Sequence, residues 1–235
     1  NINNITIAGN EIHGAMNSEG ISIYGIGTSP VNNVRIISNR IHDLALRGEI
    51  EAMPINGNVS NFQIIGNSGY KLQNLFIDVI GGEEKGPSGR DQPFGGTIAY
   101  NFADGVSSKS NPNYNSYSAA GIYSDGGRDL NIYGNYIRNS DFGIEIASEH
   151  AGIDSSNVRA HGNILERSAV AWVKLGYVGG VQNSVVNNNL VIGDSINKIE
   201  REGQIGADVY VRANDSTSDR NKVSKLPAEI MALLK

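Results

Sequence analysis

The chain has 235 residues, with 29 glycines, no cysteine and a formal net charge of -5. This length suits one large all-β domain or two small ones, and the lack of cysteine excludes a disulfide framework and a thiolate metal site. The chain has no basic patch for nucleic acid and no apolar run long enough for a transmembrane helix, so neither partner is expected.

A short phrase recurs along the chain: an alternating apolar run, a Gly-Asn or similar pair, and a further apolar residue. It occurs at residues 3–14, 32–43, 60–71, 128–139, 155–167 and 182–193. The asparagine of each turn repeats with a period of about 28 residues, which is typical of a solenoid. The gap between Asn67 and Asn135 is about twice the usual spacing, so Asn101 is expected to mark a further coil, and Asn221 a last, degraded one.

Each period contains two or three short strands, in which residues such as Ile5 and Ile7 share one face. No LxxLxL pattern and no helical half accompany them, which excludes a leucine-rich repeat. The pattern predicts a parallel β-helix of about eight coils over residues 1–225. Stacked coils place the turn asparagines above one another, so we assign these residues to a structural hydrogen-bonded ladder.

Two regions depart from the period. Residues 83–118 are rich in Gly, Pro, Ser and Asn, and we expect loops there on the binding face. Residues 226–235 have Pro227 at a suitable first helical position, which predicts a short helix capping the last coil. The first coil has no such cap, so further N-terminal coils or an additional domain are expected, and a homo-oligomer stays open.

A second set of strands lies between the asparagine turns, at residues 19–27, 75–84, 120–127, 142–150 and 170–180. Aligning them on their Gly-Ile start puts the isoleucines inward. One outward column is then Ser22, Asp78, Tyr123 and Glu145. The next outward column is Tyr24, Ile80, Asp125 and Ala147. Acidic and aromatic side chains are therefore predicted to gather on one face.

Glu149 and His150 follow at the end of the same strand as Glu145. Carboxylates that lie close together raise one another's pKa, which would suit acid/base chemistry on a glycosidic bond. Polar binding, a bound calcium ion and a merely solvated face are alternatives that the residues leave open.

The only tryptophan, Trp172, has two possible orientations. If Ala171 and Val173 point inward, Trp172 and Lys174 point outward and would serve as a sugar-stacking platform and a cation. In the other register Trp172 joins the core and Lys174 is buried. We prefer the first register because burying a lysine is costly, and Tyr177 would then line the same groove.

The segments FIDVIGGEE (76–84) and GIYSDGGRDLNIYGNYIRNSDFGIEIASEHAG (121–152), with the repeated NNxxIxGN turns, carry a family resemblance. The chain resembles the right-handed parallel β-helix superfamily, and within it the bacterial secreted repeat-containing proteins that are similar to pectate lyases. The resemblance implies a right-handed helix, an extracellular location and polysaccharide binding, often with cleavage. The motif sets of polygalacturonases and pectate lyases are missing.

We therefore predict an extracellular polysaccharide-active protein, most simply an enzyme. Its candidate catalytic residues are Asp78, Asp125, Glu145, Glu149, His150 and Lys174. Its candidate substrate-binding residues are Tyr24, Tyr123, Arg128, Trp172 and Tyr177. No metal ligands are assigned.

Two reactions are open for these residues. In a lyase, Lys174 or His150 would remove a uronate C5 proton while Arg128 or calcium neutralises the sugar carboxylate. In a hydrolase, two of the carboxyl groups would act as acid and base. A uronate C5 epimerase and a non-catalytic glycan-binding rod, such as an adhesin or a phage tail-type protein, are the alternatives.

Overall fold

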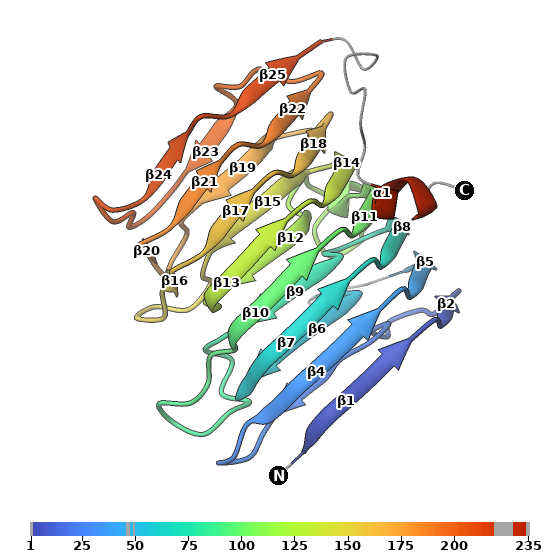
Figure 1. The fold of residues 1–235 in the computed structure, drawn as a ribbon, viewed down its shortest axis with the longest axis vertical. Coiled ribbons are helices and arrows are strands. Elements are labelled where there is room, and N and C mark those ends of the chain that lie inside the picture. Colours follow the sequence, from blue (N-terminus) through green and yellow to red (C-terminus); the bar gives the residue numbers. More distant parts are fainter. Residues whose placement is uncertain (1, 46–47, 49, 219–227, 234–235) are drawn as a thin grey trace.

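The computed structural model describes residues 2–45, 48, 50–218 and 228–233. The chain winds through three parallel sheets in turn, so that each coil adds one strand to each sheet (Figure 1). The first sheet contains β1 (Asn3–Ala8), β4 (Val31–Ile37), β7 (Val59–Ile65), β10 (Phe94–Ala99), β13 (Arg128–Tyr133), β17 (Arg159–His161), β21 (Val185–Asn187) and β24 (Tyr210–Arg212), with the short strands β16 (Ser155–Ser156) and β20 (Val181–Gln182) beside this path.

The second sheet contains β2 (Glu11–His13), β5 (Arg40–Leu44), β8 (Ser68–Leu72), β11 (Phe102–Val106), β14 (Tyr136–Ser140), β18 (Ile164–Glu166), β22 (Leu190–Ile192) and β25 (Asp215–Thr217). The third sheet contains β3 (Ile23–Gly25), β6 (Met53–Gly57), β9 (Ile77–Ile80), β12 (Ala120–Asp125), β15 (Phe142–Ala147), β19 (Ala171–Leu175) and β23 (Ile199–Arg201). This arrangement confirms the predicted parallel β-helix.

The coil predicted around Asn101 is present, formed by β10, β11 and β12. The expectation that residues 83–118 are loops is therefore wrong for β10 and β11, whose alternating apolar residues join the first two sheets. Loops remain on either side of these strands, and the later one begins with the 3-10 turn η1 (Ser108–Ser110).

Stacked isoleucines fill the interior beneath the first sheet. Ile36, Ile64, Ile98 and Ile132 lie in register on successive strands and are fully buried. Repetition of one residue shape on every coil allows the side chains to nest without gaps, because successive strands lie only about 4.8 Å apart. The period of the sequence is thus the period of the core.

The turn asparagines form the predicted ladder between the first and second sheets. The backbone N–H and the side-chain amide of Asn67 both donate to Oδ1 of Asn101, at 2.9 and 3.0 Å. The glycine before the asparagine, such as Gly66 with φ 66°, supplies the left-handed backbone of the turn. In the described part of the chain the ladder ends at Asn214, whereas Asn221 lies outside the described residues.

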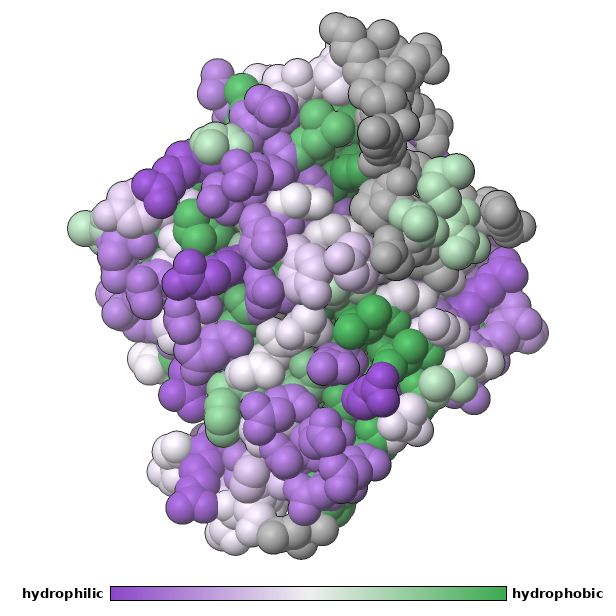
Figure 2. Space-filling view, in the orientation of Figure 1, coloured by the Kyte–Doolittle hydropathy of each residue, from purple (hydrophilic) through white to green (hydrophobic). Residues whose placement is uncertain are grey.

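Figure 2 shows that hydrophilic residues cover much of the face turned toward the viewer, which includes the outer side of the first sheet. The only helix longer than a turn among the described residues is α1 (Ala228–Leu233), within the range predicted for a cap. Figure 1 draws it near the ends of β8 and β11 in this view rather than beyond β25, so its capping role stays a prediction. No helix in the described ranges has the length and apolar character needed to cross a membrane.

Candidate active site

The outer side of the third sheet carries a row of polar side chains in register. Asp78 on β9 pairs with Tyr123 on β12, which pairs with Glu145 on β15, which in turn pairs with Lys174 on β19. Asp125 lies two residues beyond Tyr123 and points to the same side, because strand side chains alternate. The outward column predicted from the sequence is therefore present, with Lys174 as its next member.

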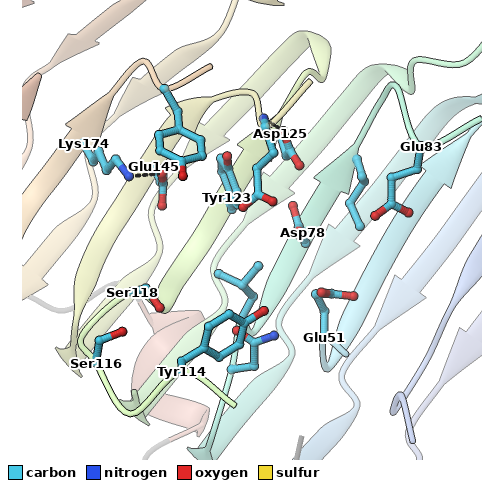
Figure 3. Close-up of a pocket in the computed structure, with 15 residues that line it drawn as sticks. Glu51, Asp78, Glu83, Tyr114, Ser116, Ser118, Tyr123, Asp125, Glu145 and Lys174 are labelled. Carbon is cyan, nitrogen blue, oxygen red and sulfur yellow. Dashed lines mark hydrogen bonds and ion pairs between the residues drawn. The ribbon is translucent and has the colours of Figure 1, made fainter. Parts of the chain in front are cut away.

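These residues line a pocket with a volume of about 340 Å³. Figure 3 shows the side chains pointing into it from successive strands, with the loop of Tyr114, Ser116 and Ser118 along one side. The pocket has six carboxyl groups, those of Glu51, Asp78, Glu83, Asp125, Glu145 and Glu149. The ammonium of Lys174 is the only cation among its lining residues.

Burial makes four of these carboxyl groups weaker acids, those of Glu51, Asp78, Asp125 and Glu145. The pKa of Asp125 is raised to about 8, first by desolvation and also by the charge of Glu149, although the Glu149 backbone N–H donates to its Oδ1 at 2.7 Å and opposes the shift. Desolvation and the nearby Asp125 raise the pKa of Asp78 well above its ordinary value. Desolvation and Glu83 raise the pKa of Glu51 to about 8. The pocket therefore holds protonated carboxyl groups at neutral pH.

Glu145 differs from the other carboxyl groups that line the pocket because, among the described residues, it has a cationic partner. Its Oε1 lies 3.0 Å from Nζ of Lys174. Desolvation raises the pKa of Glu145 to about 7, while Lys174 acts in the opposite direction. Desolvation alone would lower the pKa of Lys174. The negative charges of Glu145 and of the more distant Glu200 and Glu202 outweigh desolvation, so the pKa of Lys174 is raised. Glu145 is thus the buried carboxyl group with the strongest support for its ionised form.

Two polar atoms in the pocket have no hydrogen-bond partner among the described residues. They are Oδ1 of Asp78 and the phenol oxygen of Tyr123, in side chains that are 3% and 2% exposed. An unpaired buried polar group costs about 1–3 kcal/mol, so such groups often mark a binding site. Desolvation and the surrounding carboxylates also raise the pKa of Tyr123 well above its ordinary value, which keeps the phenol a hydrogen-bond donor.

The remaining predicted residues divide between the pocket and other places. Glu149 and Tyr177 line the pocket. His150 follows Glu149 but is not among the lining residues, and its Nε2 is buried without a partner in the described structure. Arg128 begins β13 in the first sheet, where its guanidinium lies 5.5 Å from the ring centroid of Phe94. It too lies outside the pocket lining.

Tyr24 lies in a different hollow, at the first coils. Its hydroxyl donates to Oε1 of Glu19, and desolvation raises its pKa. It lines a second pocket with Ile2 and Ile26 rather than the acidic one. Tyr24 is in register with Asp125, as predicted, through Asn56 on β6 and Ile80 on β9. These intervening strands separate the two side chains, so Tyr24 does not reach the acidic pocket.

The prediction that Trp172 forms an exposed sugar platform is wrong. Trp172 is fully buried in the main core together with Val173, and its indole N–H donates to the carbonyl oxygen of Ile196 at 2.9 Å. Ala171 instead packs in the outer cluster with Tyr123. The inward–outward alternation of side chains therefore breaks at the start of β19. As a result Trp172 lies in the core while Lys174 still points outward beside Glu145.

We expect the Trp172→Phe variant to be less stable by about 1–2 kcal/mol, because the indole hydrogen bond and part of the core packing are lost. Urea unfolding measures this change. Glycan binding is expected to stay as in the unaltered protein, and a binding defect in folded Trp172→Phe protein would restore the platform interpretation.

Sequence reasoning missed Glu51 as a site residue, and it treated Glu83 and Tyr114 only as parts of loops. Glu51 is 8% exposed and lies just before β6, a strand whose proline hid it from the alignment. The amide of Asn56 on β6 donates to Oε2 of Glu83 at 2.6 Å. Extending the alignment to Met53–Gly57 would have placed this strand beside that of Asp78, with Asn56 next to Ile80, although Glu51 and Glu83 lie outside the paired residues.

The raised pKa values predict how stability depends on pH. Between the unfolded pKa of about 3.9 for an aspartate and the folded pKa of about 8 for Asp125, the folded protein binds more protons than the unfolded chain. The free energy of unfolding should therefore fall as the pH rises through this window. Urea unfolding at pH 5, 7 and 9 tests this, and Asp125→Asn should flatten the decline. A stability that rises from pH 5 to pH 9 would contradict the assignment.

In the ranges that the structure describes, no group of three or more His, Cys, Asp or Glu side chains is arranged to hold a metal ion. The carboxyl groups labelled in Figure 3 are spread over several strands rather than gathered around one point. The calcium ion considered from the sequence stays a prediction.

Comparison with known proteins supports the fold. No model of a known family matches the chain. The chain is 33% identical over 160 residues to YwoF of Bacillus subtilis (strain 168), an uncharacterised protein. The matched region covers 66% of this chain and 34% of YwoF. The chain thus spans about a third of this relative's length.

Two solved structures are similar in fold. One is a glycoside hydrolase, with a TM-score of 0.56 and 12% identity over 91% of this chain and 41% of that one. The other is a mannuronic acid specific polysaccharide family 6 lyase from the human gut microbiota, with a TM-score of 0.54 and 16% identity over 98% of this chain and 52% of that one. At these sequence identities the similarity supports the parallel β-helix fold alone, so the reaction has to be argued from the residues of the pocket.

Proposed function

We propose that this protein is a glycoside hydrolase that cleaves an extracellular polysaccharide in the acidic pocket of the third sheet. The observation that carries the proposal is the contrast between two neighbouring carboxyl groups. Asp125 is buried and has no cationic partner among the described residues, whereas Glu145 lies 3.0 Å from Lys174. Environments that favour the acid form of one carboxyl and the anionic form of another are what acid/base hydrolysis requires.

In this mechanism Asp125 carries the proton. Its pKa of about 8 keeps it largely protonated at neutral pH, so it can donate a proton to the glycosidic oxygen. Glu145, whose pKa of about 7 leaves about half of it ionised at neutral pH, takes a proton from the attacking water when it is in its carboxylate form, which Lys174 favours. Tyr123, between them, donates a hydrogen bond to a sugar hydroxyl. Asp78 accepts one from the other end of the pocket.

The spacing favours inversion at the anomeric carbon. Asp125 and Glu145 stand on adjacent strands with an offset of two residues, and the standard strand spacings then separate their Cα atoms by roughly 8 Å. Inverting hydrolases have carboxyl groups about 6.5–9.5 Å apart, whereas retaining enzymes need about 5–5.5 Å. Strand side chains stand roughly perpendicular to the sheet, so carboxyl groups that extend in parallel keep about the separation of their Cα atoms. We propose on this basis that a water molecule fits between Glu145 and the sugar.

A lyase mechanism has less support from the same residues. Lys174 is held as an ammonium by its carboxylate neighbours, so it is a poor base for a C5 proton. His150 is not part of the pocket lining. Because the fold is similar to that of a polysaccharide lyase, β-elimination is the alternative reaction that the experiment must distinguish from hydrolysis.

The test is incubation with a panel of neutral, amino and acidic polysaccharides, in which reducing ends, chain length and unsaturated uronate are followed together. Hydrolysis produces reducing ends without unsaturated product, and proton NMR of the first product should show the inverted anomer. Unsaturated uronate would mean a lyase. Changed uronate stereochemistry without shortening would mean an epimerase. Binding without any chemical change would mean a glycan-binding protein.

A further inference from the structure

We infer that the pocket takes a sugar unit with a free amino group, a cationic hexosamine, in preference to a uronate. This inference deepens the proposed function and rests on the same pocket. It follows from charge: six carboxyl groups line the pocket and face a single cation. A bound ammonium would favour the ionised form of these carboxyl groups, whereas a uronate carboxylate would oppose it and gain no free cation in return.

The one cation is already balanced by the protein. Nζ of Lys174 lies 3.0 Å from Oε1 of Glu145, 3.8 Å from Glu202 and 4.0 Å from Glu200. Its ammonium also lies 4.7 Å from the ring centroid of Tyr177. Lys174 is therefore committed to partners of opposite charge and to an aromatic face, and it offers little to a sugar carboxylate.

At the opposite end of the pocket no cationic side chain is among the lining residues that the structure describes. Glu51, Asp78 and Glu83 lie there, away from Lys174 (Figure 3). Oδ1 of Asp78 is buried and has no hydrogen-bond partner in the described structure. An ammonium group supplies three N–H donors and a positive charge. It would donate a hydrogen bond to this oxygen and lower the pKa of the neighbouring carboxyl groups, which favours their ionised form.

Tyr123 adds a second unpartnered group beside Asp78. Its phenol oxygen is buried at the centre of the row and is paired with no described residue. A hexosamine offers both groups that these two atoms need: the amine for Asp78 and an adjacent hydroxyl for Tyr123. Tyr114 and Tyr177, which are 37% and 38% exposed, are positioned at the rim to contact the sugar ring.

Isothermal titration calorimetry with three tetrasaccharides tests the inference at pH 7 and low salt. The probes are the fully deacetylated glucosamine tetramer, cellotetraose and tetragalacturonate. The glucosamine tetramer is expected to bind about tenfold more tightly than cellotetraose, since several carboxylates act on one ammonium. Its advantage should shrink when salt is added. Equal or tighter binding of tetragalacturonate, or no binding of the glucosamine tetramer, overturns the inference.

Glu51→Gln and Asp78→Asn each remove a carboxyl group that a bound ammonium would ionise, with little change of shape, and each should weaken glucosamine-tetramer binding about threefold to tenfold. Cellotetraose binding should change less. Glu84→Gln, an exposed glutamate outside the pocket lining, is the matched control and should leave the affinity unaltered. Circular dichroism of each variant establishes that it is folded, and equal affinity of folded Glu51→Gln and Asp78→Asn with the unaltered protein overturns the inference.

Binding and cleavage separate this inference from the proposed function. Tight binding of the glucosamine tetramer without cleavage of any glycan supports the charge preference and removes the hydrolase. Hydrolysis of a uronate polymer, with weak binding of the glucosamine tetramer, retains the hydrolase and removes the preference.

Discussion

Glu145→Gln and Asp125→Asn should each lower kcat by about 100-fold to 10,000-fold, the usual contribution of a general acid or base. Asparagine and glutamine keep the shape of the acids and one carbonyl oxygen, so the Glu149 N–H can still donate to residue 125. They cannot transfer the proton. The initial rate of reducing-end formation, measured on whichever polysaccharide the panel identifies, gives the effect.

The pH profile distinguishes a catalytic role from a structural one. The unaltered enzyme should show a bell-shaped profile of kcat/KM, and Asp125→Asn should lose its alkaline limb while Glu145→Gln loses its acidic limb. Glu11→Gln is the control, since Glu11 is a fully exposed glutamate on the second sheet that pairs with His42. Full activity in either pocket variant would rule out that residue as acid or base.

The local pattern of the sequence predicted most of what depends on register. Coils of similar length stack with the same residue at the same place, so the spacing of the asparagines was enough to predict the coil at Asn101. The alternation of β9, β12 and β15 was enough to predict the outward row of Asp78, Tyr123 and Glu145. Both inferences needed only the period of the chain and the two-residue period of a strand.

The errors arose where the backbone leaves these two periods. At Trp172 two successive residues point inward, and the alternation rule does not predict such a break. The aligned positions of β12 and β15 are Gly121 and Gly143, which have no side chain to reveal it. Glu51 belongs to a coil whose strand begins with Met53 and Pro54, and this coil lacks the Gly-Ile start of the others. Glu51 lies before the residues of this strand that pair with β9, so the register alone does not place it beside the site.

Arg128 shows a further limit of reading position along the chain. It follows Asp125 by only three residues, yet the turn between them carries the chain from the third sheet to the first. Asp125 and Arg128 therefore face different sides of the helix. In a solenoid, two residues that are close in sequence within one coil can lie on different faces. Residues at equivalent positions of successive coils lie on the same face.

The asparagine ladder should be the most sensitive element of the fold. Asn101 is fully buried at its centre: its amide donates to Ile64 and Asn135, both at 2.9 Å, and its Oδ1 accepts two bonds from Asn67. Asn101→Ala leaves these buried partners unsatisfied, so we expect a loss of about 3–5 kcal/mol in the free energy of unfolding. Asn10→Ala, at the exposed first step, removes an asparagine whose partners water can reach, and should cost about 1 kcal/mol or less. Urea midpoints compare the two, and equal losses would mean that burial does not set the strength of the ladder.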